Sequence, residues 1–407
     1  MKPWPCYSEN EIGAAAAVLR AGKVNYWTGE ECRKFEQEFA EFCNARHAVA
    51  VANGTVALEL ALRALDIGPG DEVVVPARTF IASASCVVAC GAKPIFADVD
   101  RDSQNLTAES VLNVLSPRTK AIIAVHLAGW ACDMDPLLAL AAQRNLKVVE
   151  DCAQAHGATY KGRRVGALGD VAGFSFCQDK IISTAGEGGM LVTNDSDVWE
   201  KAWSYKDHGK SYHAVYHQQH PPGFHWVHHS LGTNWRMTEI SAAIGRLQLE
   251  KLEAWLERRR ENAAILTHNF QVESALRVTR PPDHIGHAYY KYLVFVRPDR
   301  LKPGWSRDRI MMEISSRGVP CFTGPCAEVY MERAFESGGY RPAQRLPVAK
   351  ELGETGLAFL VHPTLSDEDM RITCDVVDSV LSEAIRAISL PTVATEDREL
   401  TDQMKAP

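Results

Sequence analysis

An acidic residue and a lysine stand out in this sequence because each follows a segment that is typical of a buried strand. Asp151 follows the largely apolar run at 146–150, and Lys180 lies four residues beyond the run at 171–176. Open α/β sheets bind ligands at the carboxyl ends of their strands, so a carboxylate there is either functional or a cap for local backbone. Glycines at 186, 188 and 189 follow the lysine and indicate backbone packed closely against a ligand or another chain.

A phosphate site is predicted at a second strand end. Gly54 and Thr55 follow the apolar run at 47–52 and begin a segment with helical periodicity. The free N–H groups and the dipole of a helix N-terminus bind phosphate, although an ordinary strand-to-helix turn has the same sequence. Ser175, at the end of another predicted strand, could supply a further phosphate ligand.

These parts together match what pyridoxal phosphate requires. Its phosphate would bind Gly54, Thr55 and Ser175, and its aldehyde would form a Schiff base with the amine of Lys180. Asp151 would pair with the ring nitrogen and keep it protonated, which makes the ring an electron sink. Holding that proton through about three pKa units is worth about 4 kcal/mol, which one charge pair at about 4 Å supplies at an effective dielectric of about 20.

The elements that must position these residues alternate along the chain. Short β-branched runs are separated by segments with helical periodicity, which favours an α/β fold with a mainly parallel sheet between helices. We expect a large cofactor-binding domain over 1–250, whose seven predicted strands lie at 47–52, 72–76, 93–98, 120–126, 146–150, 171–176 and 189–193.

A smaller α+β domain is expected to follow, over 251–390. A long helix predicted at 237–270 would bridge the two domains, because its apolar residues keep a helical period. A strand is predicted at 289–296 and a helix at 366–386, which Ser366 and Asp369 would open as a capping box. The polar tail at 391–407 is expected to be poorly ordered.

The composition limits the function classes. The 407 residues carry a formal net charge of −7, so no strong field favours nucleic acid or an anionic membrane surface. We find no apolar stretch long enough for a membrane span and no apolar segment at the N-terminus that would predict export. The eleven cysteines form no C-x-x-C pair, which favours reduced thiols and a cytoplasmic location. The local basic run at 258–260 is interpreted as a solvated helix face.

Several longer segments resemble the DegT/DnrJ/StrS family of nucleotide-sugar aminotransferases, which share the fold type I architecture of aspartate aminotransferase. The matching stretches include GDEVVVPARTF (70–80), VEDCAQAHGATYKGRRVGALGD (149–170), KDHG (206–209) and TNWRM (233–237). They follow the family's order from about Trp27 to His362, which covers most of the chain.

The resemblance implies a role for each matching residue. Lys180 and Asp151 are the expected catalytic residues, and Phe80 would stack on the cofactor ring. Gln154 would lie against the ring or its 3-hydroxyl. Asn234 would reach the phosphate in the neighbouring subunit, which implies a homodimer with shared active sites.

The implied reaction is a transamination in two halves. An amino acid, by family habit glutamate, would leave pyridoxamine phosphate, which would then aminate a nucleotide-linked keto sugar. Our interpretation is a UDP- or dTDP-linked 4-keto-6-deoxy sugar for a surface glycan. The alternatives are a keto-cyclitol acceptor and a non-catalytic regulatory homologue, and the intact Lys180, Asp151 and Gln154 argue against the second. A dehydratase branch of the family has histidine in place of the lysine that this chain keeps.

Histidines leave further alternatives open. Seven of them lie between 208 and 229, and the spacing of His213 and His217 makes a metal site conceivable. We predict no metal, because no carboxylate or cysteine cluster accompanies them, and favour a dimer interface or contacts to substrate phosphates. His126 and His156 follow predicted strand ends and are either ligand contacts or structural residues.

Overall fold

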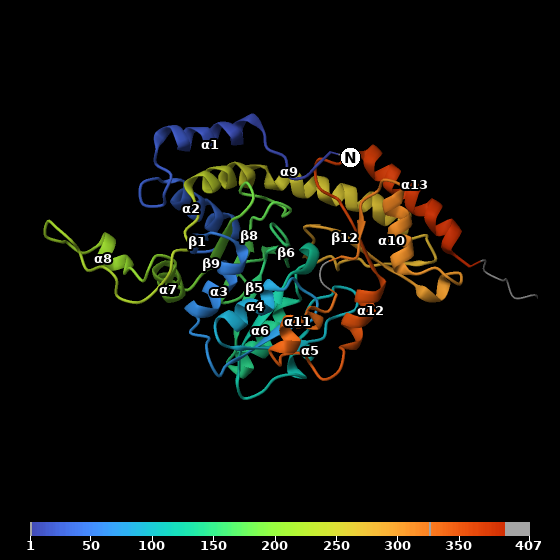
Figure 1. The fold of residues 1–407 in the computed structure, drawn as a ribbon, viewed down its shortest axis with the longest axis horizontal. Coiled ribbons are helices and arrows are strands. Elements are labelled where there is room, and N and C mark those ends of the chain that lie inside the picture. Colours follow the sequence, from blue (N-terminus) through green and yellow to red (C-terminus); the bar gives the residue numbers. More distant parts are fainter. Residues whose placement is uncertain (1, 325–326, 387–407) are drawn as a thin grey trace, which may run out of the picture.

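A seven-stranded sheet forms the centre of the molecule (Figure 1), with the order β1-β9-β8-β5-β4-β2-β3. The computed structural model describes residues 2–324 and 327–386, so the predicted tail at 391–407 lies outside the described residues. β9 is antiparallel to both its neighbours and the other pairs are parallel, which confirms the prediction of a mainly parallel sheet. The strands are β1 (His47–Val51), β2 (Glu72–Pro76), β3 (Lys93–Ala97), β4 (Thr119–Val125), β5 (Lys147–Asp151), β8 (Val171–Ser175) and β9 (Gly189–Thr193).

Helices cover both faces of this sheet because successive residues of each strand point to opposite sides. In β4, Ile122 belongs to one hydrophobic cluster and Ile123 belongs to the other. The first cluster includes side chains of α2 (Glu31–Cys43), α5 (Ala108–Leu112), α6 (Met134–Arg144) and α9 (Glu239–Phe270). The second includes side chains of α3 (Gly54–Ala64), α4 (Ala82–Ala89) and α7 (Ser196–Lys206).

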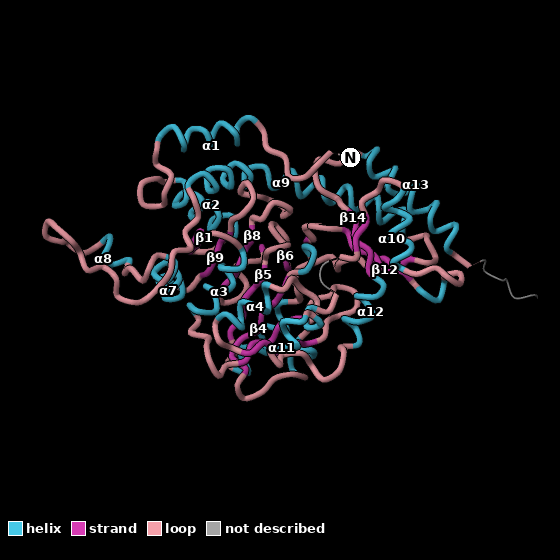
Figure 2. Tube along the Cα trace, viewed as in Figure 1, coloured by secondary structure: helices cyan, strands magenta, loops and turns pink. Residues whose placement is uncertain are grey.

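A separate four-stranded antiparallel sheet follows in the chain, and Figure 2 shows its strands apart from those of the large sheet. Its order is β10 (Leu276–Val278), β12 (Tyr292–Val296), β14 (Gly356–Phe359) and β13 (Cys321–Phe322). α10 (Arg307–Ser316) and α13 (Asp367–Ala384) pack on it in a third hydrophobic cluster, to which Leu266 and Phe270 of α9 also belong. The strand predicted at 289–296 is β12, which begins three residues later than predicted, at Tyr292.

The remaining elements are short or lie at the periphery. A three-stranded sheet joins β11 (Ile285–Gly286), β6 (Thr159–Tyr160) and β7 (Arg163–Arg164). The other helices are α1 (Glu9–Ala21), α8 (Tyr212–Tyr216), α11 (Arg333–Ser337) and α12 (Pro347–Thr355), with 3-10 turns at Leu127–Gly129, Pro298–Arg300 and Val329–Met331. Within the described ranges, we find no helix with the length and apolar character of a membrane span.

The long helix predicted at 237–270 is α9, and α1 lies along it (Figure 1). The interpretation of 258–260 as a solvated face is wrong for Arg259, which is only 1% exposed. Leu252, Leu256 and Ala263 are buried on the same helix, and their spacing places residue 259 on the inner face. Its guanidinium donates to the carbonyl of Tyr289 at 3.2 Å.

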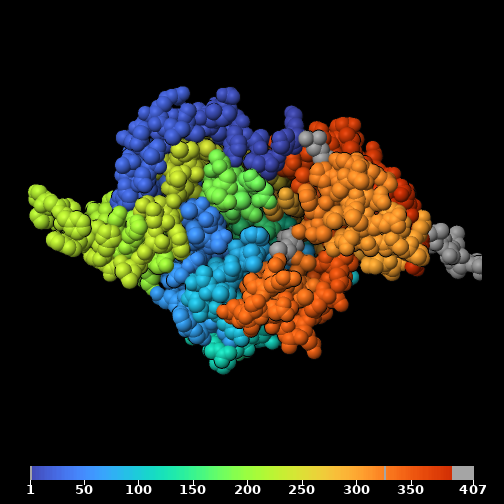
Figure 3. Space-filling view, in the orientation of Figure 1, coloured from blue at the N-terminus to red at the C-terminus, as the bar shows by residue number. Residues whose placement is uncertain are grey.

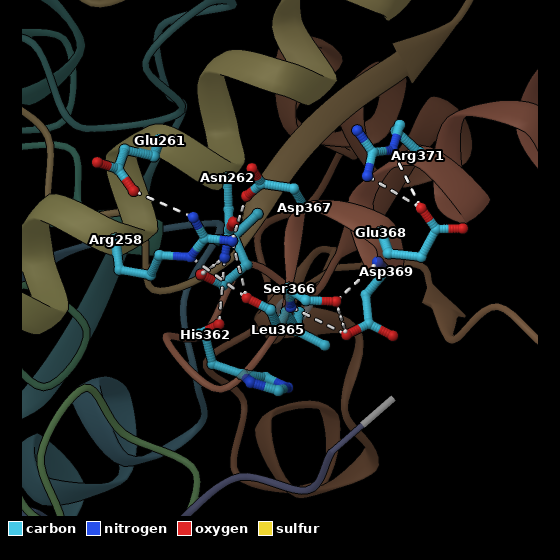
Figure 4. Close-up of polar contacts among 11 residues, drawn as sticks. Arg258, Glu261, Asn262, His362, Leu365, Ser366, Asp367, Glu368, Asp369 and Arg371 are labelled. Atoms are coloured by element: carbon cyan, nitrogen blue, oxygen red, sulfur yellow. Dashed lines mark hydrogen bonds and ion pairs between the residues drawn. The ribbon is translucent and has the colours of Figure 1, made fainter.

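α9 is also bound to the start of α13 by polar contacts (Figure 4). Arg258 donates to the carbonyl of Leu365 at 3.0 Å and pairs with Asp367 at 2.6 Å. The predicted capping box at Ser366 and Asp369 is present, so the sequence pattern identified this helix start correctly.

Residues 210–228, which include α8, project from one end of the molecule and are called here the excursion around α8 (Figure 3). A backbone bridge joins Lys210 to His228 and closes the excursion at its base. Large apolar side chains on it face solvent, with exposed fractions of 76% for Phe224 and 83% for Trp226, and Leu231, just beyond the bridge, is 93% exposed.

Candidate active site

Three of the predicted site residues, Asp151, Ser175 and Gly54, lie at one edge of the large sheet. β5 ends at Asp151 and β8 ends at Ser175, and these two strands are parallel neighbours. β1 leads through Asn53 into α3, which begins at Gly54. Because parallel strands end on the same side of a sheet, the fold brings a carboxylate, a hydroxyl and a helix N-terminus together.

Gly54 and Ser175 form a close cradle at this edge. A Cβ on Gly54 would lie 2.5 Å from the Cβ of Ser175, so only glycine permits this approach. The Asn53 side chain accepts the N–H of Val56 at 3.0 Å and fixes the first turn of α3. The first N–H groups of the helix lack intrahelical partners, and with the Ser175 hydroxyl they suit an anion such as a phosphate.

Asp151 is a buried carboxylate with few donors. Its Oδ2 accepts the hydroxyl of Ser83 at 2.6 Å and its Oδ1 accepts the N–H of Ala153 at 3.1 Å. Burial raises the pKa of Asp151 above its ordinary value, against the opposing effects of these hydrogen bonds and of the Lys180 charge. A cation held beside this carboxylate would be stabilised strongly, because little solvent screens the pair.

Lys180 lies in the loop at 176–188 between β8 and the antiparallel β9. Its side chain is 16% exposed, and its Nζ lies 3.6 Å from an oxygen of Asp179. The same Nζ lies 4.9 Å from the ring centroid of Tyr290, whose hydroxyl donates to Asp179. The amine is therefore held in a partly enclosed position with one carboxylate neighbour.

The two residues expected at the cofactor ring differ in exposure. Gln154 is buried, and its Oε1 accepts the N–H of Ala128 at 2.8 Å, which fixes the amide. Phe80 lies between β2 and α4 and is 58% exposed. An exposed phenyl ring on this side of the sheet has a free face for stacking.

Asn234 lies outside the group formed by Asp151, Ser175 and Gly54. It is exposed, bridges to the backbone of Asp207 and accepts the N–H of Arg236 at 3.4 Å. Its segment runs beside the end of β1, where the N–H of Ala52 donates to the Trp235 carbonyl at 2.8 Å. Among the described residues its polar partners are thus not those of the cradle.

His126 belongs to a buried hydrogen-bond network with Glu150 and Cys132. Its Nε2 lies 3.0 Å from Glu150, and its Nδ1 accepts the N–H of Cys132 at 3.0 Å. His126, Glu150 and Cys152 lie within metal-binding distance of one another. However, Glu150 already accepts three backbone N–H groups from 166–169, so its lone pairs serve the protein itself. Burial opposes ionisation of Glu150, but His126 and these N–H groups hold its pKa below the ordinary value.

His156 is buried between aromatic rings. Its ring centroid lies 5.5 Å from that of Phe174 and 5.7 Å from that of Phe176. Burial, reinforced by the charge of Lys180, lowers the pKa of His156 to about 3. The imidazole is therefore neutral at physiological pH.

Sequence reasoning missed Ser83 and Tyr290. Ser83 follows β2, one turn beyond Phe80, so attention to every polar residue near the sheet edge would have found it. Tyr290 precedes β12 of the second sheet, and no local pattern predicts its approach to Lys180.

Comparison with solved structures finds the same fold in aminotransferases. An aminotransferase from Psychrobacter cryohalolentis is 53% identical with a TM-score of 0.92, and the match covers 94% of this chain and 99% of that one. A putative sugar aminotransferase from Streptococcus pneumoniae, solved in a PLP-form and a PMP-form, is 25% identical, with TM-scores of 0.83 and 0.85. These matches cover 94% of this chain and 99% or 100% of the other.

Comparison with curated proteins gives the same result. A model of the DegT/DnrJ/EryC1/StrS aminotransferase family matches residues 5–380. GDP-perosamine synthase of Escherichia coli O157:H7 is 36% identical over 94% of this chain and 100% of its own length. A dTDP-3-amino-3,4,6-trideoxy-alpha-D-glucose transaminase of Streptomyces venezuelae is 37% identical over 86% of this chain and 87% of its length.

Replacing Gly54 with alanine should destabilise the protein by about 1–3 kcal/mol, because the added methyl group would overlap Ser175. Gly13→Ala is the matched control, since nothing lies within 4 Å of that Cβ and alanine favours the helix by about 0.5–1 kcal/mol. Urea unfolding of both variants measures the difference. Equal stability of the two variants would contradict the close approach of Gly54 and Ser175.

Stability should fall as the pH is lowered from 7 to 4, in part through His156. The unfolded chain takes up a proton at this residue near pH 6.5, whereas the folded chain takes it up only near pH 3. The contribution of neutral His156 to the free energy of unfolding is therefore fully present above pH 6.5. It decreases by up to about 1.4 kcal/mol for each pH unit below that value. His156→Leu should flatten the decline of the melting temperature, and exposed His213→Leu should not. A slope equal to that of the parent protein in both variants would exclude this role.

Proposed function

Because the chain belongs to the DegT/DnrJ/EryC1/StrS aminotransferase family, we propose that it transfers an amino group from an amino acid to a nucleotide-linked keto sugar with pyridoxal phosphate as cofactor. The single observation that carries this proposal is the buried carboxylate of Asp151 at a sheet edge shared with Ser175 and the start of α3. Lys180 lies in the loop that returns from the same edge.

The residues present fit pyridoxal phosphate. The cradle of Gly54 and Ser175, with Thr55 beside it at the start of α3, offers N–H and hydroxyl donors for a phosphate. A Cβ on Gly54 would fill this cradle. The raised pKa of Asp151 is what a carboxylate shows when it is buried without a cation directly beside it, and a protonated ring nitrogen would be that cation. When bound, pyridoxal phosphate supplies an electron sink for the carbanion formed at the donor's α-carbon.

The roles of the protein groups follow from their chemistry. Asp151 keeps the proton on the ring nitrogen, and Ser83 orients that carboxylate through its 2.6 Å hydrogen bond. Lys180 would hold the cofactor until the donor's amine displaces it, and its released Nζ would then accept the proton that leaves the donor's α-carbon. In the second half, Nζ returns a proton to the sugar carbon that becomes aminated. Phe80 would cover one face of the ring, and Gln154 would lie against the ring or its 3-hydroxyl.

The donor is glutamate in our proposal, and the acceptor is a keto sugar linked to a nucleotide. The named relatives act on a GDP-linked and a dTDP-linked sugar, so they support the class of acceptor but not one nucleotide. We retain a 4-keto-6-deoxy sugar for a surface glycan as the preferred acceptor. A keto-cyclitol is the alternative, because the same transamination chemistry serves both.

A homodimer completes the proposal. The excursion around α8 exposes Phe224 and Trp226, and exposed aromatic side chains of this kind mark protein interfaces. The segment with Asn234 follows this excursion, and Asn234 is exposed. In the dimer, Asn234 of the partner subunit would approach the phosphate bound at Gly54, so each active site would need both chains.

The purified protein with pyridoxal phosphate should absorb above 400 nm, and glutamate should bleach that band. Lys180→Ala should lose the band and at least about a thousandfold of turnover, because no other group replaces its proton transfer. Lys201→Ala removes a half-exposed lysine and is the control. A panel of GDP-, dTDP- and UDP-linked keto sugars and a keto-cyclitol, each assayed with glutamate, identifies the acceptor. Full turnover by Lys180→Ala, or a colourless parent protein, would refute the proposal.

Phe224→Ser combined with Trp226→Ser should weaken the dimer by more than about tenfold, because large aromatic residues dominate interface energies. Val272→Ser is the control. Val272 is 75% exposed, which is close to the values of Phe224 and Trp226, but it lies beyond the end of α9 and outside the excursion. Sedimentation equilibrium measures the dissociation constants. A parent protein that is monomeric, or equal constants for both variants, would contradict the assignment of this interface.

A further inference from the structure

The N-terminal arm, residues 2–11, contacts the loop that carries Lys180. The indole Nε1 of Trp4 donates to the carbonyl of Lys180 at 2.8 Å, although 176 positions separate the two residues in the chain. This contact is made to the backbone of the lysine and does not involve its amine, which lies beside Asp179. The arm therefore binds the peptide from which the reactive side chain extends.

A second group of contacts binds the same loop three residues later. The hydroxyl of Tyr7 donates to Ser183 at 3.2 Å. The N–H of Ser183 donates to Gln248 of α9 at 3.3 Å, and the amide of Gln248 donates to Glu11 at 2.6 Å. Ser183, Gln248 and Glu11 are buried, so water does not compete for these bonds. The arm thus contacts the loop directly through Trp4 and Tyr7. It also contacts the loop indirectly, because Glu11 binds Gln248, which binds Ser183.

Trp4 itself packs against three residues from two other parts of the molecule, α9 and the segment before α13. Its ring meets Trp255 edge-on at 5.0 Å and lies stacked 6.1 Å from His362, with the Arg259 guanidinium 5.2 Å away. The carbonyl of Pro3 accepts the hydroxyl of Thr364 at 3.1 Å. Figure 1 shows the N-terminus beside α9 and α13, where this packing occurs. The indole N–H consequently has little freedom to leave the Lys180 carbonyl.

The loop itself contributes few bonds that would fix Lys180. The N–H of Lys180 donates to Cys177 at 3.0 Å in a tight turn, and Gln178 donates to Gly186 at 3.0 Å across the loop. No helix or strand contains residues 176–188. A lysine amine at the end of four rotatable bonds is positioned only as well as its Cα is held, and displacements of about 1 Å are costly in catalysis.

We propose that the N-terminal arm is a positioning element for Lys180, with Trp4 as the residue that holds its peptide. The inference rests on the proposed function, in which Lys180 holds the cofactor. Trp4 acts through the backbone of Lys180 and touches neither cofactor nor substrate. Because the same indole packs on His362, the arm also connects the lysine loop to the segment that leads into α13.

The test compares Trp4→Phe, which keeps an aromatic ring and removes the N–H donor, with Trp305→Phe, which makes the same change at a tryptophan that packs in the small-domain core away from the arm. Hydrogen exchange of the peptide covering 177–187 should be about threefold to tenfold faster in Trp4→Phe, the range expected for one lost hydrogen bond. Trp305→Phe should exchange at the parent rate. Tyr7→Phe is a second variant and should speed exchange around Ser183.

The loaded enzyme gives an independent readout. In Trp4→Phe, kcat should fall by about threefold to tenfold while the KM for glutamate changes by less than about twofold, because binding groups are untouched. The pH midpoint of the absorbance above 400 nm should move by about half a unit. Trp305→Phe should retain the parent kcat and midpoint.

The outcomes separate this inference from the proposed function. Parent-like exchange and absorbance in Trp4→Phe would overturn the positioning role, as would equal changes in Trp4→Phe and Trp305→Phe. If the parent protein binds no pyridoxal phosphate, the proposed function fails. Faster loop exchange in Trp4→Phe would then still support the arm as the element that holds the peptide of Lys180.

Discussion

The parallel pairing of β4, β5 and β8 is the constraint on which the site depends. It sends the carboxyl ends of these strands to one edge, so Asp151 and Ser175 become neighbours although they lie in different strands. β9 then returns antiparallel beside β8, and such a return needs only a loop instead of a crossover helix. That loop carries Lys180 back over the same edge. The sheet thus places the carboxylate and the amine, while α3 brings the helix N-terminus.

Two adjacent carboxylates show how the fold sets charge. Glu150 and Asp151 follow one another on β5 and therefore point to opposite faces. Glu150 accepts bonds from three backbone N–H groups and contacts His126, and its pKa lies below the ordinary value. Asp151 has two donors, and burial raises its pKa. The first carboxylate is satisfied by the protein, whereas the second suits an external cation.

α9 connects the parts of the molecule that surround the lysine loop. Its inner face supplies Leu252 and Leu256 to one core and Leu266 and Phe270 to another. Between these positions lies Arg259, whose guanidinium binds the carbonyl of Tyr289 close to the site. The N-terminal arm packs on the same helix through Trp4 and Trp255. A shift of α9 would therefore be transmitted through the arm to the lysine loop.

The sequence by itself determined the strands and the long helix, whereas the cofactor residues remain predictions from strand-end motifs and from the family resemblance. These rest on local information, namely apolar runs, helical periodicity, a capping box at Ser366 and motifs at the strand ends. Only the tertiary structure decided that Arg259 is buried, that Ser83 binds Asp151 and that Trp4 binds the peptide of Lys180. Such contacts join residues up to 176 positions apart and depend on the angles and distances at which whole elements pack, which no local pattern of residue types encodes.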